Sequence, residues 1–255
     1  MASLEYAFNA AFNWVAWGTL VLAPVVFIVL LFVRAPYGRH VRGGWGPMLG
    51  NRLGWFLMEL PAVFVFGGIW LVFAKPAVVP VVLFLMWQLH YCHRVFVYPL
   101  TIRKGGQMPL LILLMAVVFN TSNGYLNAWS IASQADKYQL AWLWAPQFLA
   151  GFTLFVAGMV LNKVSDRQLA RLRKEGEGYR IPHGLAYRWV SCPNYLGEII
   201  QWTGWAIAVW SLAGWIFAIW TIANLAPRAI AHHRWYRETF PGYPPTRRAL
   251  IPFLL

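Results

Sequence analysis

The chain has 255 residues, of which 60% are hydrophobic and only 11% are charged, and its formal net charge is +13. Soluble proteins carry about 25% charged residues, and the apolar residues here come in runs long enough to span a bilayer, which takes about 20 residues per helix. The composition excludes an ordinary soluble domain and predicts an all-α, polytopic membrane protein. Because Lys and Arg gather between the apolar runs, we expect anionic lipid or an anionic cofactor as partner, and no nucleic acid.

The apolar runs predict five separate spans followed by one longer stretch. The five spans cover residues 11–33, 56–73, 78–98, 109–129 and 142–161. The stretch 195–226 is too long for one straight span and short for two. We assign it two short helices with a break near Ser211, because the distribution of basic residues favours that choice.

The basic residues set the predicted orientation. With two helices in 195–226, 19 of the 21 Lys and Arg residues fall on one side of the membrane, and only Lys75 and Lys137 fall on the other. Cytoplasmic loops carry such an excess of positive charge. The sequence therefore predicts seven transmembrane helices in one domain, residues 1–255, with the N-terminus outside, the C-terminus cytoplasmic and the first run retained as a span rather than cleaved.

Two other classes of site are not expected. Cys92 lies in a predicted span and Cys192 in a predicted loop, so we expect no disulfide. His232 and His233 are adjacent on a helix and point apart, and no carboxylate or thiolate completes a metal-binding set. The sequence predicts no metal site.

Several polar groups stand where a membrane protein seldom has them. A charged carboxylate such as Glu59 costs about 2.5–3.5 kcal/mol at mid-membrane on insertion scales, so it usually faces a cavity or a partner. Tyr91, Arg94 and Tyr98 share one helix face at the end of the third span. The alternative interpretation is structural: an interfacial acid, and an interfacial Tyr with a snorkelling Arg.

Two further sets have helical spacing beyond the fifth and the last spans. Asn162, Asp166 and Arg173 share one face, and so do Arg228, His232 and Tyr236 in a later segment. Each set alone is also typical of a solvated amphipathic extension. Together the sets indicate a polar, cation-rich site that opens into an apolar chamber at the cytoplasmic end of one bundle.

Six segments resemble the steroid 5α-reductase (3-oxo-5α-steroid 4-dehydrogenase) family. The resemblance covers nearly the whole chain, is densest after residue 162, and suggests a bacterial homologue. The segments are MELPA at 58–62, HYCHRVFVYP at 90–99, NKVSDRQLARLRK at 162–174, YRIPHGLAYRWVSCPNYLGE at 179–198, PRAIAHHRWY at 227–236 and YPPTRRALIPFLL at 243–255.

The resemblance implies an NADPH-dependent oxidoreductase that reduces the Δ4 double bond of 3-oxo-Δ4 steroids to 5α-dihydrosteroids. Hydride adds to carbon 5 while Tyr91 and Glu59 polarise the carbonyl at carbon 3. The Tyr91 hydroxyl donates a hydrogen bond, and a neutral Glu59 donates another or orients the tyrosine. The proton for carbon 4 comes from Tyr91 or from water. No obligate protein partner is expected.

The resemblance also implies a division of the chain. The substrate chamber comes mainly from the first four spans and the cofactor site mainly from residues 162–255. The residues expected to bind NADPH are Asn162, Asp166, Arg173, Asn194, Arg228, His232 and Tyr236, with Arg94, Tyr98 and Glu198 beside the same pocket.

The chain departs from the family pattern at two places, and other activities stay open. Met58 stands where the family usually has Gln before the Glu of its ELP motif, and the IPHGLAY segment is one residue shorter than usual. The alternatives are a related membrane reductase acting on enoyl thioesters or sterol double bonds, an isoprenylcysteine-type methyltransferase using S-adenosylmethionine, and a transporter. The compact loops favour a bacterial inner membrane over the endoplasmic reticulum.

Overall fold

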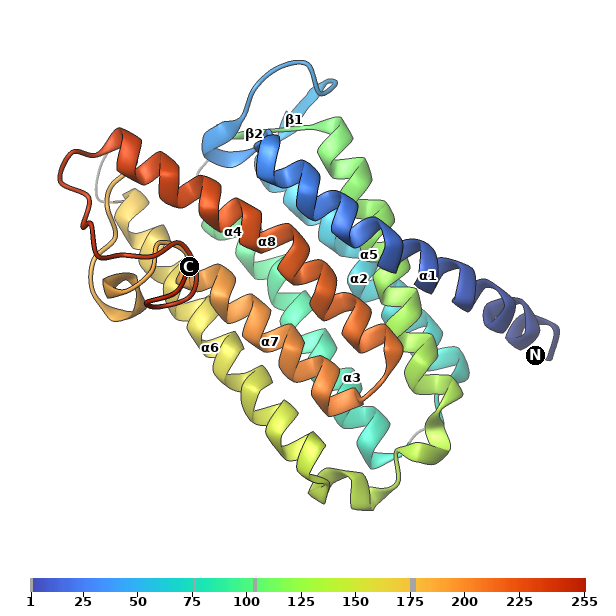
Figure 1. Cartoon of the computed structure of the whole chain (residues 1–255). Helices are drawn as coiled ribbons and strands as arrows, with labels where there is room; N and C mark the ends of the chain where they lie inside the picture. Colours follow the sequence, from blue (N-terminus) through green and yellow to red (C-terminus); the bar gives the residue numbers. More distant parts are fainter. Residues whose placement is uncertain (1, 76, 103–104, 175–177) are drawn as a thin grey trace.

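The computed structural model describes residues 2–75, 77–102, 105–174 and 178–255. Within these residues seven long α-helices form a bundle (Figure 1). The long helices are α1 (Ala2–Phe32), α2 (Asn51–Phe73), α3 (Val78–Cys92), α5 (Leu110–Ser133), α6 (Pro146–Lys174), α7 (Pro193–Val209) and α8 (Leu212–Thr239). Each predicted span overlaps one of them, but only 56–73 lies wholly within its helix; the third span, 78–98, runs past the end of α3 into the turns that follow it. Arg103 and Lys104, two of the basic residues counted on the cytoplasmic side, lie outside the described residues.

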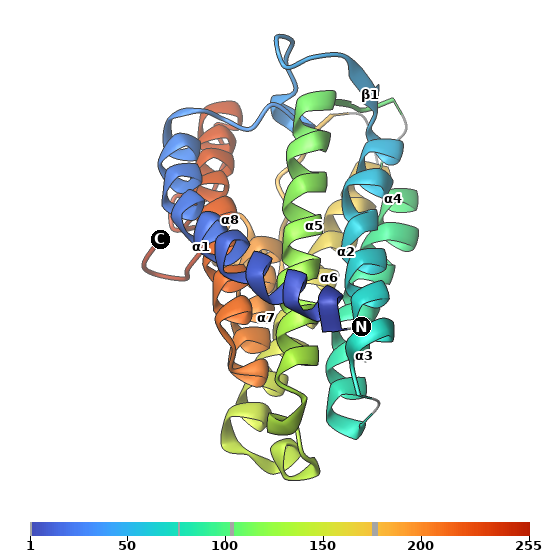
Figure 2. The same ribbon diagram turned by 90° about the vertical axis from the view of Figure 1, so that its right-hand side faces the viewer.

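Consecutive long helices alternate in direction, and α1 runs obliquely across α8 and α5 (Figures 1 and 2). Four segments are long and apolar enough to cross a bilayer: Ser3–Phe32, Asn51–Phe73, Leu110–Ser133 and Pro146–Arg173. The chain is therefore a helical membrane protein. The number of crossings, seven, and the orientation of the termini across the membrane both stay predictions.

The break predicted near Ser211 is confirmed. Trp210 adopts the left-handed conformation with φ 49°, and the Ser211 hydroxyl then caps α8 by accepting a hydrogen bond from the Gly214 N–H. The two helices are unequal, with 17 residues in α7 and 28 in α8, so the expectation of two short helices was wrong for α8. The second helix is longer because its basic segment continues the helix beyond the apolar run.

Glycines hold α6 and α7 unusually close together. A Cβ atom built on Gly158 would lie 2.3 Å from the backbone nitrogen of Gln201, and one built on Gly204 would lie 2.4 Å from that of Phe155. Gly151 and Gly197 make equally close approaches, so each helix contributes two glycines seven residues apart. Only glycine permits such backbone contact. The pair α6–α7 is therefore a rigid unit that carries functional residues at its far end.

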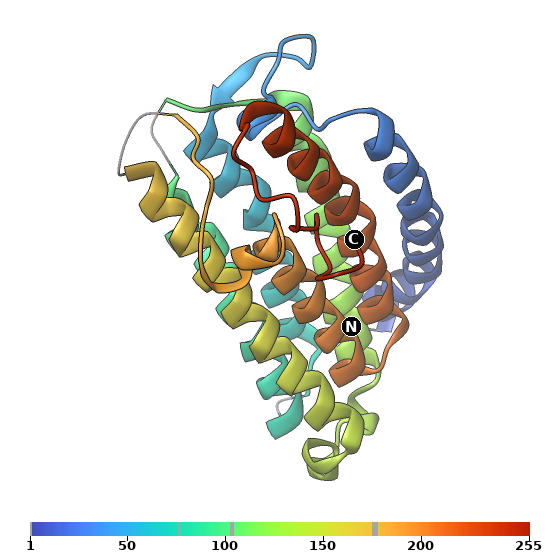
Figure 3. The same ribbon diagram turned by 60° about the vertical axis from the view of Figure 1, so that its left-hand side comes forward.

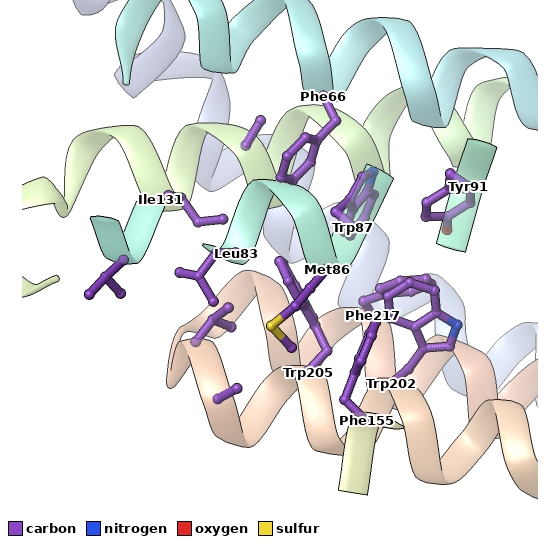
Figure 4. Packing of buried hydrophobic residues seen from close by; sticks show 14 of the residues in the cluster. Phe66, Leu83, Met86, Trp87, Tyr91, Ile131, Phe155, Trp202, Trp205 and Phe217 are labelled. Atoms are coloured by element: carbon purple, nitrogen blue, oxygen red, sulfur yellow. The ribbon is translucent and has the colours of Figure 1, made fainter. Parts of the chain in front are cut away.

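An aromatic cluster fills the centre of the bundle (Figure 4). Trp87 of α3 stacks on Phe66 of α2 with ring centroids 4.5 Å apart, and Trp202 of α7 lies 4.2 Å from Phe217 of α8. Tyr91 lies at one end of the cluster, next to Trp87. The cluster fixes α3, α7 and α8 relative to one another and places Tyr91 at the boundary of the packed core.

Long loops gather at the opposite end of the bundle from the 210–211 break. They include a short antiparallel pair, β1 (Met48–Gly50) and β2 (Gln107–Pro109), which the all-α prediction did not contain. A π-helical turn, His93–Val97, and α4 (Tyr98–Thr101) prolong α3 toward this end. The C-terminal segment folds back over the start of α7 (Figure 3), where the Ser191 N–H donates to the Arg248 carbonyl at 2.8 Å. Both cysteines are free.

Candidate active site

One cavity of about 700 Å³ lies between the helices beneath these loops. Its wall is formed by α1, α2, α3 with its π-helical turn, α5, α6, α7 and α8, together with the loops after α1 and α4. The structure brings all twelve predicted site residues to this wall. They are Glu59, Tyr91, Arg94, Tyr98, Asn162, Asp166, Arg173, Asn194, Glu198, Arg228, His232 and Tyr236.

Arg94 links the two halves of the cavity. Its Nε and Nη2 donate to Glu59 Oε1 at 3.0 and 2.5 Å, and its Nη1 lies 3.8 Å from Glu198 Oε1. Its guanidinium also lies over the rings of Trp55 and Tyr98. This charge-assisted pair favours an ionised Glu59, whereas the sequence analysis expected a neutral acid. Arg94, which the sequence analysis placed beside the cofactor pocket, therefore also binds Glu59, the acid expected near the substrate.

Tyr91 is buried, with 4% of its surface exposed, and it lines the cavity. Its ring lies 4.8 Å from that of Trp87 and 5.6 Å from that of Trp202, which fixes the plane of the phenol. Met58 lies on the same wall. It packs against Met108, and its backbone carbonyl accepts a hydrogen bond from Asn120 at 2.6 Å. This part of the cavity is apolar apart from a few polar groups.

A second cluster forms where α6 meets the start of α7. Asn162 Nδ2 donates to the Asn194 carbonyl at 3.0 Å, and Asn194 Nδ2 donates to Asp166 Oδ1 at 3.0 Å. The close glycine contacts between these helices set the spacing of the three side chains. Arg173, two turns beyond Asp166, lines the same cavity. The cluster presents hydrogen-bonding groups on a rigid frame.

A third cluster joins α8 to the loop after α1. Arg228 Nη2 donates to the Tyr195 hydroxyl at 3.0 Å, and that hydroxyl lies 3.1 Å from Nε2 of His232. Nδ1 of His232 lies 3.3 Å from Nε2 of His40, and the two imidazole rings stack with centroids 5.2 Å apart. The chain of contacts reaches from α8 through α7 to the loop that follows α1.

Sequence reasoning missed the contribution of that loop. Arg39 lies against three rings, those of Tyr179, Trp235 and Tyr236, at 4.5–4.9 Å from their centroids. Its Nη1 is buried and has no hydrogen-bond partner among the residues that the structure describes. The signal was a basic and aromatic segment, RAPYGRH at 34–40, which was treated only as loop charge. The missed cavity residues of this cluster are Tyr37, Arg39, His40, Tyr195 and Asn224.

The cation-rich end of the cavity suits an anionic ligand that has planar rings. Arg39, Arg173 and Arg228 line it, and burial together with the neighbouring arginines lowers the pKa of His40 to about 4. Burial is the larger cause of this shift, and the arginines add a positive potential that phosphate oxygens would relieve. The residues present therefore fit a phosphate-bearing dinucleotide. Among the described residues, no group of three or more His, Cys, Asp or Glu side chains could hold a metal ion.

The apolar helices and the internal cavity define a helical membrane protein with a buried binding site. A profile of the family 3-oxo-5-alpha-steroid 4-dehydrogenase matches residues 106–255. Steroid 5-alpha-reductase DET2 of Arabidopsis thaliana is 41% identical over 253 residues, covering 92% of this chain and 94% of that protein. The 3-oxo-5-alpha-steroid 4-dehydrogenase 1 of Mus musculus is 42% identical over 243 residues, covering 92% and 93%, and that of Homo sapiens is 39% identical over 222 residues, covering 86% and 85%. The chain belongs to the 3-oxo-5-alpha-steroid 4-dehydrogenase family and is an oxidoreductase.

Proposed function

We propose that the protein reduces the Δ4 double bond of 3-oxo-Δ4 steroids with NADPH and releases 5α-dihydrosteroids. The observation that carries the proposal is the meeting, in one cavity, of the Tyr91 hydroxyl with a cation-rich end that fits a dinucleotide. The similarity to the plant and mammalian enzymes supports the choice of a steroid as substrate. The apolar side chains that line the cavity together with Met58, such as Met108, Ile112 and Met115, suit such a ligand.

On the substrate side, Tyr91 donates a hydrogen bond to the oxygen at carbon 3. Negative charge grows on that oxygen as carbon 5 is reduced, and a fixed donor in a dry site is worth about 3–4 kcal/mol. The ion pair between Glu59 and Arg94 lies on the same wall and fixes the Arg94 guanidinium at the junction of the chamber with the cofactor end. Carbon 4 gains its proton from Tyr91 or from water.

On the cofactor side, three clusters would hold NADPH. Asn162, Asp166 and Asn194 offer donors and acceptors for the ribose and amide groups, and Arg173 and Arg228 match phosphate oxygens. His232 and Tyr236 supply further polar contacts beside them, and Tyr98 and Glu198 border the same space. When bound, NADPH supplies the hydride that reduces carbon 5. The location that we propose is a bacterial inner membrane, as expected from the sequence.

The test is product analysis with membranes that contain the protein. A mixed panel of 3-oxo-Δ4 steroids, enoyl thioesters and sterols is supplied with NADPH or NADH, and the products are identified by mass spectrometry. We expect 5α-dihydrosteroids with NADPH. Reduction of only the enoyl or sterol members would refute the steroid assignment, and equal rates with NADH would refute the cofactor assignment.

Substitution of Tyr91 tests the residue that the proposal places at the reacting oxygen. Tyr91→Phe should lower turnover by roughly 10²-fold or more, the scale of losing one oxyanion donor. The matched control is Tyr125→Phe, which removes a phenol that donates to the Phe8 carbonyl between α5 and α1, away from the cavity wall. The control should keep parental turnover. An unchanged rate in Tyr91→Phe would remove this residue from the mechanism.

A further inference from the structure

A second pocket, open to the outside and about 370 Å³ in volume, lies on the surface of α8. No described residue lines both this pocket and the cavity of the proposed site. The residues around the pocket stand three or four positions apart near the end of the helix, so they share one face. The lining residues, which we call the α8 pocket, are Ile230, His233, Arg234, Arg237 and Glu238.

The α8 pocket has an excess of positive charge. Arg234 and Arg237 are exposed, and neither forms an ion pair with a residue that the structure describes. Glu238, the acid among the lining residues, instead lies 3.8 Å from Arg34, just beyond α1. Two guanidinium groups without carboxylate partners are well suited to phosphate oxygens, which they bind through paired hydrogen bonds.

The position of the pocket along α8 matches the depth of lipid headgroups. The helix begins at Leu212, and about 20 residues of helix cross the hydrocarbon core of a bilayer. With α8 as the last predicted crossing, the core therefore ends near Ala231. Arg234 and Arg237 follow within two helical turns, which places both guanidinium groups in the headgroup layer.

The last residues of the chain lie beside the α8 pocket. Ile230 packs against the buried cluster that contains Leu250. The Ser191 hydroxyl lies 2.6 Å from Nδ1 of His233 and donates to the Arg248 carbonyl at 3.1 Å. Two members of the pocket are thereby connected to the C-terminal segment that folds back over the start of α7 (Figure 3).

The C-terminal segment ends in a tight loop with apolar side chains on its outside. The N–H groups of Leu250 and Ile251 donate to the main-chain oxygen of Leu255 at 2.6 and 2.7 Å. Phe253 adopts the left-handed conformation with φ 66°, which is uncommon for residues other than glycine. Phe253 and Leu254 are 83% and 78% exposed. The loop belongs to none of the predicted spans, so a transmembrane helix does not account for these exposed apolar groups, whereas contact with the interfacial layer of a membrane does.

We propose that the α8 pocket and this loop bind an anionic phospholipid. Arg234 and Arg237 hold its phosphate, and Phe253 and Leu254 contact its acyl chains. Free phosphate would leave the apolar loop exposed, and a zwitterionic phospholipid would bring its own cation up to the arginines. A headgroup with net negative charge avoids both. The inference is independent of the proposed reaction, because the pocket and the cavity share no described lining residue.

The experiment is native mass spectrometry of the full-length protein in a neutral detergent, which counts bound lipids one at a time. The protein is titrated with phosphatidylglycerol, the anionic probe, or with phosphatidylcholine that has the same acyl chains. We expect phosphatidylglycerol to bind more tightly. Arg234→Gln/Arg237→Gln should raise the Kd of phosphatidylglycerol at least about 10-fold, because each basic group near an anionic lipid contributes severalfold. The Kd of phosphatidylcholine should not change.

The matched control is Arg167→Gln/Arg171→Gln, which removes the same charge from two exposed positions one turn apart on α6. These residues line neither the cavity nor the α8 pocket. The control should keep the parental Kd for phosphatidylglycerol. Phe253→Ser tests the loop and should raise the Kd of both lipids severalfold, since it removes apolar contact with the acyl chains.

Equal binding of the two lipids by the parental protein, or equal losses in the α8 and α6 variants, would overturn the inference, because net charge rather than the pocket would then set the affinity. Release of phosphatidylglycerol by an excess of inorganic phosphate would also overturn it, as would unchanged binding in Phe253→Ser. If the double α8 variant does not accumulate in membranes, Arg237→Gln is compared with Arg171→Gln in the same way. None of these readouts involves steroid reduction, so the proposed function and this inference can each fail without the other.

Discussion

Arg94 donates two hydrogen bonds to a single oxygen of Glu59, and both side chains are almost fully enclosed, with 13% and 6% of their surfaces exposed. Breaking a buried ion pair by removing one partner costs about 3–5 kcal/mol, because the other charge is left unpaired. We therefore expect Glu59→Gln to lower both turnover and the thermal midpoint of the protein in detergent. Turnover should fall roughly 10²-fold, as for the loss of an electrostatic group at a reacting centre.

The double variant Glu59→Gln/Arg94→Met separates the effect of Glu59 on stability from its effect on turnover. It removes both charges, so its thermal midpoint should recover toward the parental value while its turnover stays low. Replacement of a buried ion pair by apolar groups is often neutral for stability. If the double variant is as unstable as Glu59→Gln, the loss of stability does not come from an unpaired Arg94 charge. Packing of the two side chains, or the contact of Arg94 with Glu198, would then be the cause.

The close contact of α6 with α7 leads to a prediction about cofactor binding. Gly158→Ala would place a Cβ atom 2.3 Å from the backbone nitrogen of Gln201, so the helices must separate. Such overpacking typically costs 1–3 kcal/mol. Asn162, one turn after Gly158 on α6, and Asn194, at the start of α7, would then lose their hydrogen bond. We expect the Kd of NADPH to rise at least about 10-fold, the equivalent of 1.4 kcal/mol.

Gly68→Ala is the control for that change. Gly68 is exposed on α2 and has no atom within 4 Å of a Cβ at its position, and alanine favours helix over glycine. Its Kd for NADPH should equal that of the parental protein. Equal Kd values in Gly158→Ala and Gly68→Ala would show that the glycine contacts do not control the cofactor site.

Helical periodicity allowed much of the site to be predicted. Residues such as Asn162 and Asp166, or Arg228 and His232, lie one turn apart, so a single helix brings them to one face. The break at 210–211 followed from charge parity, because a single span would have put the C-terminal arginines on the wrong side. These are local properties, and the sequence carries them directly.

Contacts between distant segments could not be predicted in this way. Arg39 and His40 reach the site only because the loop after α1 folds over the end of α8, and no periodicity links position 40 to position 232. The ion pair of Glu59 with Arg94 was missed for the same reason. It spans 35 residues and two helices, and a carboxylate considered without Arg94 is expected to be neutral in an apolar span.

The far end of the bundle offers a test of stability without a change of chemistry. Lys137 Nζ donates to the last carbonyls of α7, those of Val209 at 3.0 Å and Trp210 at 2.6 Å. A cation at a helix C-terminus stabilises it by about 0.3–1 kcal/mol. The Trp210 carbonyl would also lose this donor, whereas the Val209 carbonyl keeps the Tyr138 hydroxyl at 2.9 Å. Lys137→Met should lower the thermal midpoint measurably and leave kcat unchanged, since the cavity lies at the other end.

Lys75→Met is the matched control on the same side. Lys75 pairs with Asp136 at 3.4 Å, but both side chains are largely exposed, and such pairs contribute little. We expect its thermal midpoint to equal the parental one within error. If both lysine variants unfold at the same temperature, capping of α7 by Lys137 contributes no more than a surface ion pair.

The stacked imidazoles of His40 and His232 predict how stability depends on pH. Burial and the surrounding arginines lower the pKa of His40 to about 4, whereas an unfolded chain has the ordinary value of 6.5. Between these values the unfolded chain binds more protons than the folded protein, so stability is lost as the pH falls through this window and is unaffected above it. We expect the thermal midpoint of the parental protein in detergent to fall from about pH 7.5 to about pH 5 by more than that of His40→Gln, which cannot take up the proton. From about pH 7.5 to about pH 9 the two curves should run parallel, because His40 is neutral in both states there. A His40→Gln curve that tracks the parental one down to about pH 5 would mean that His40 is not held neutral by its neighbours.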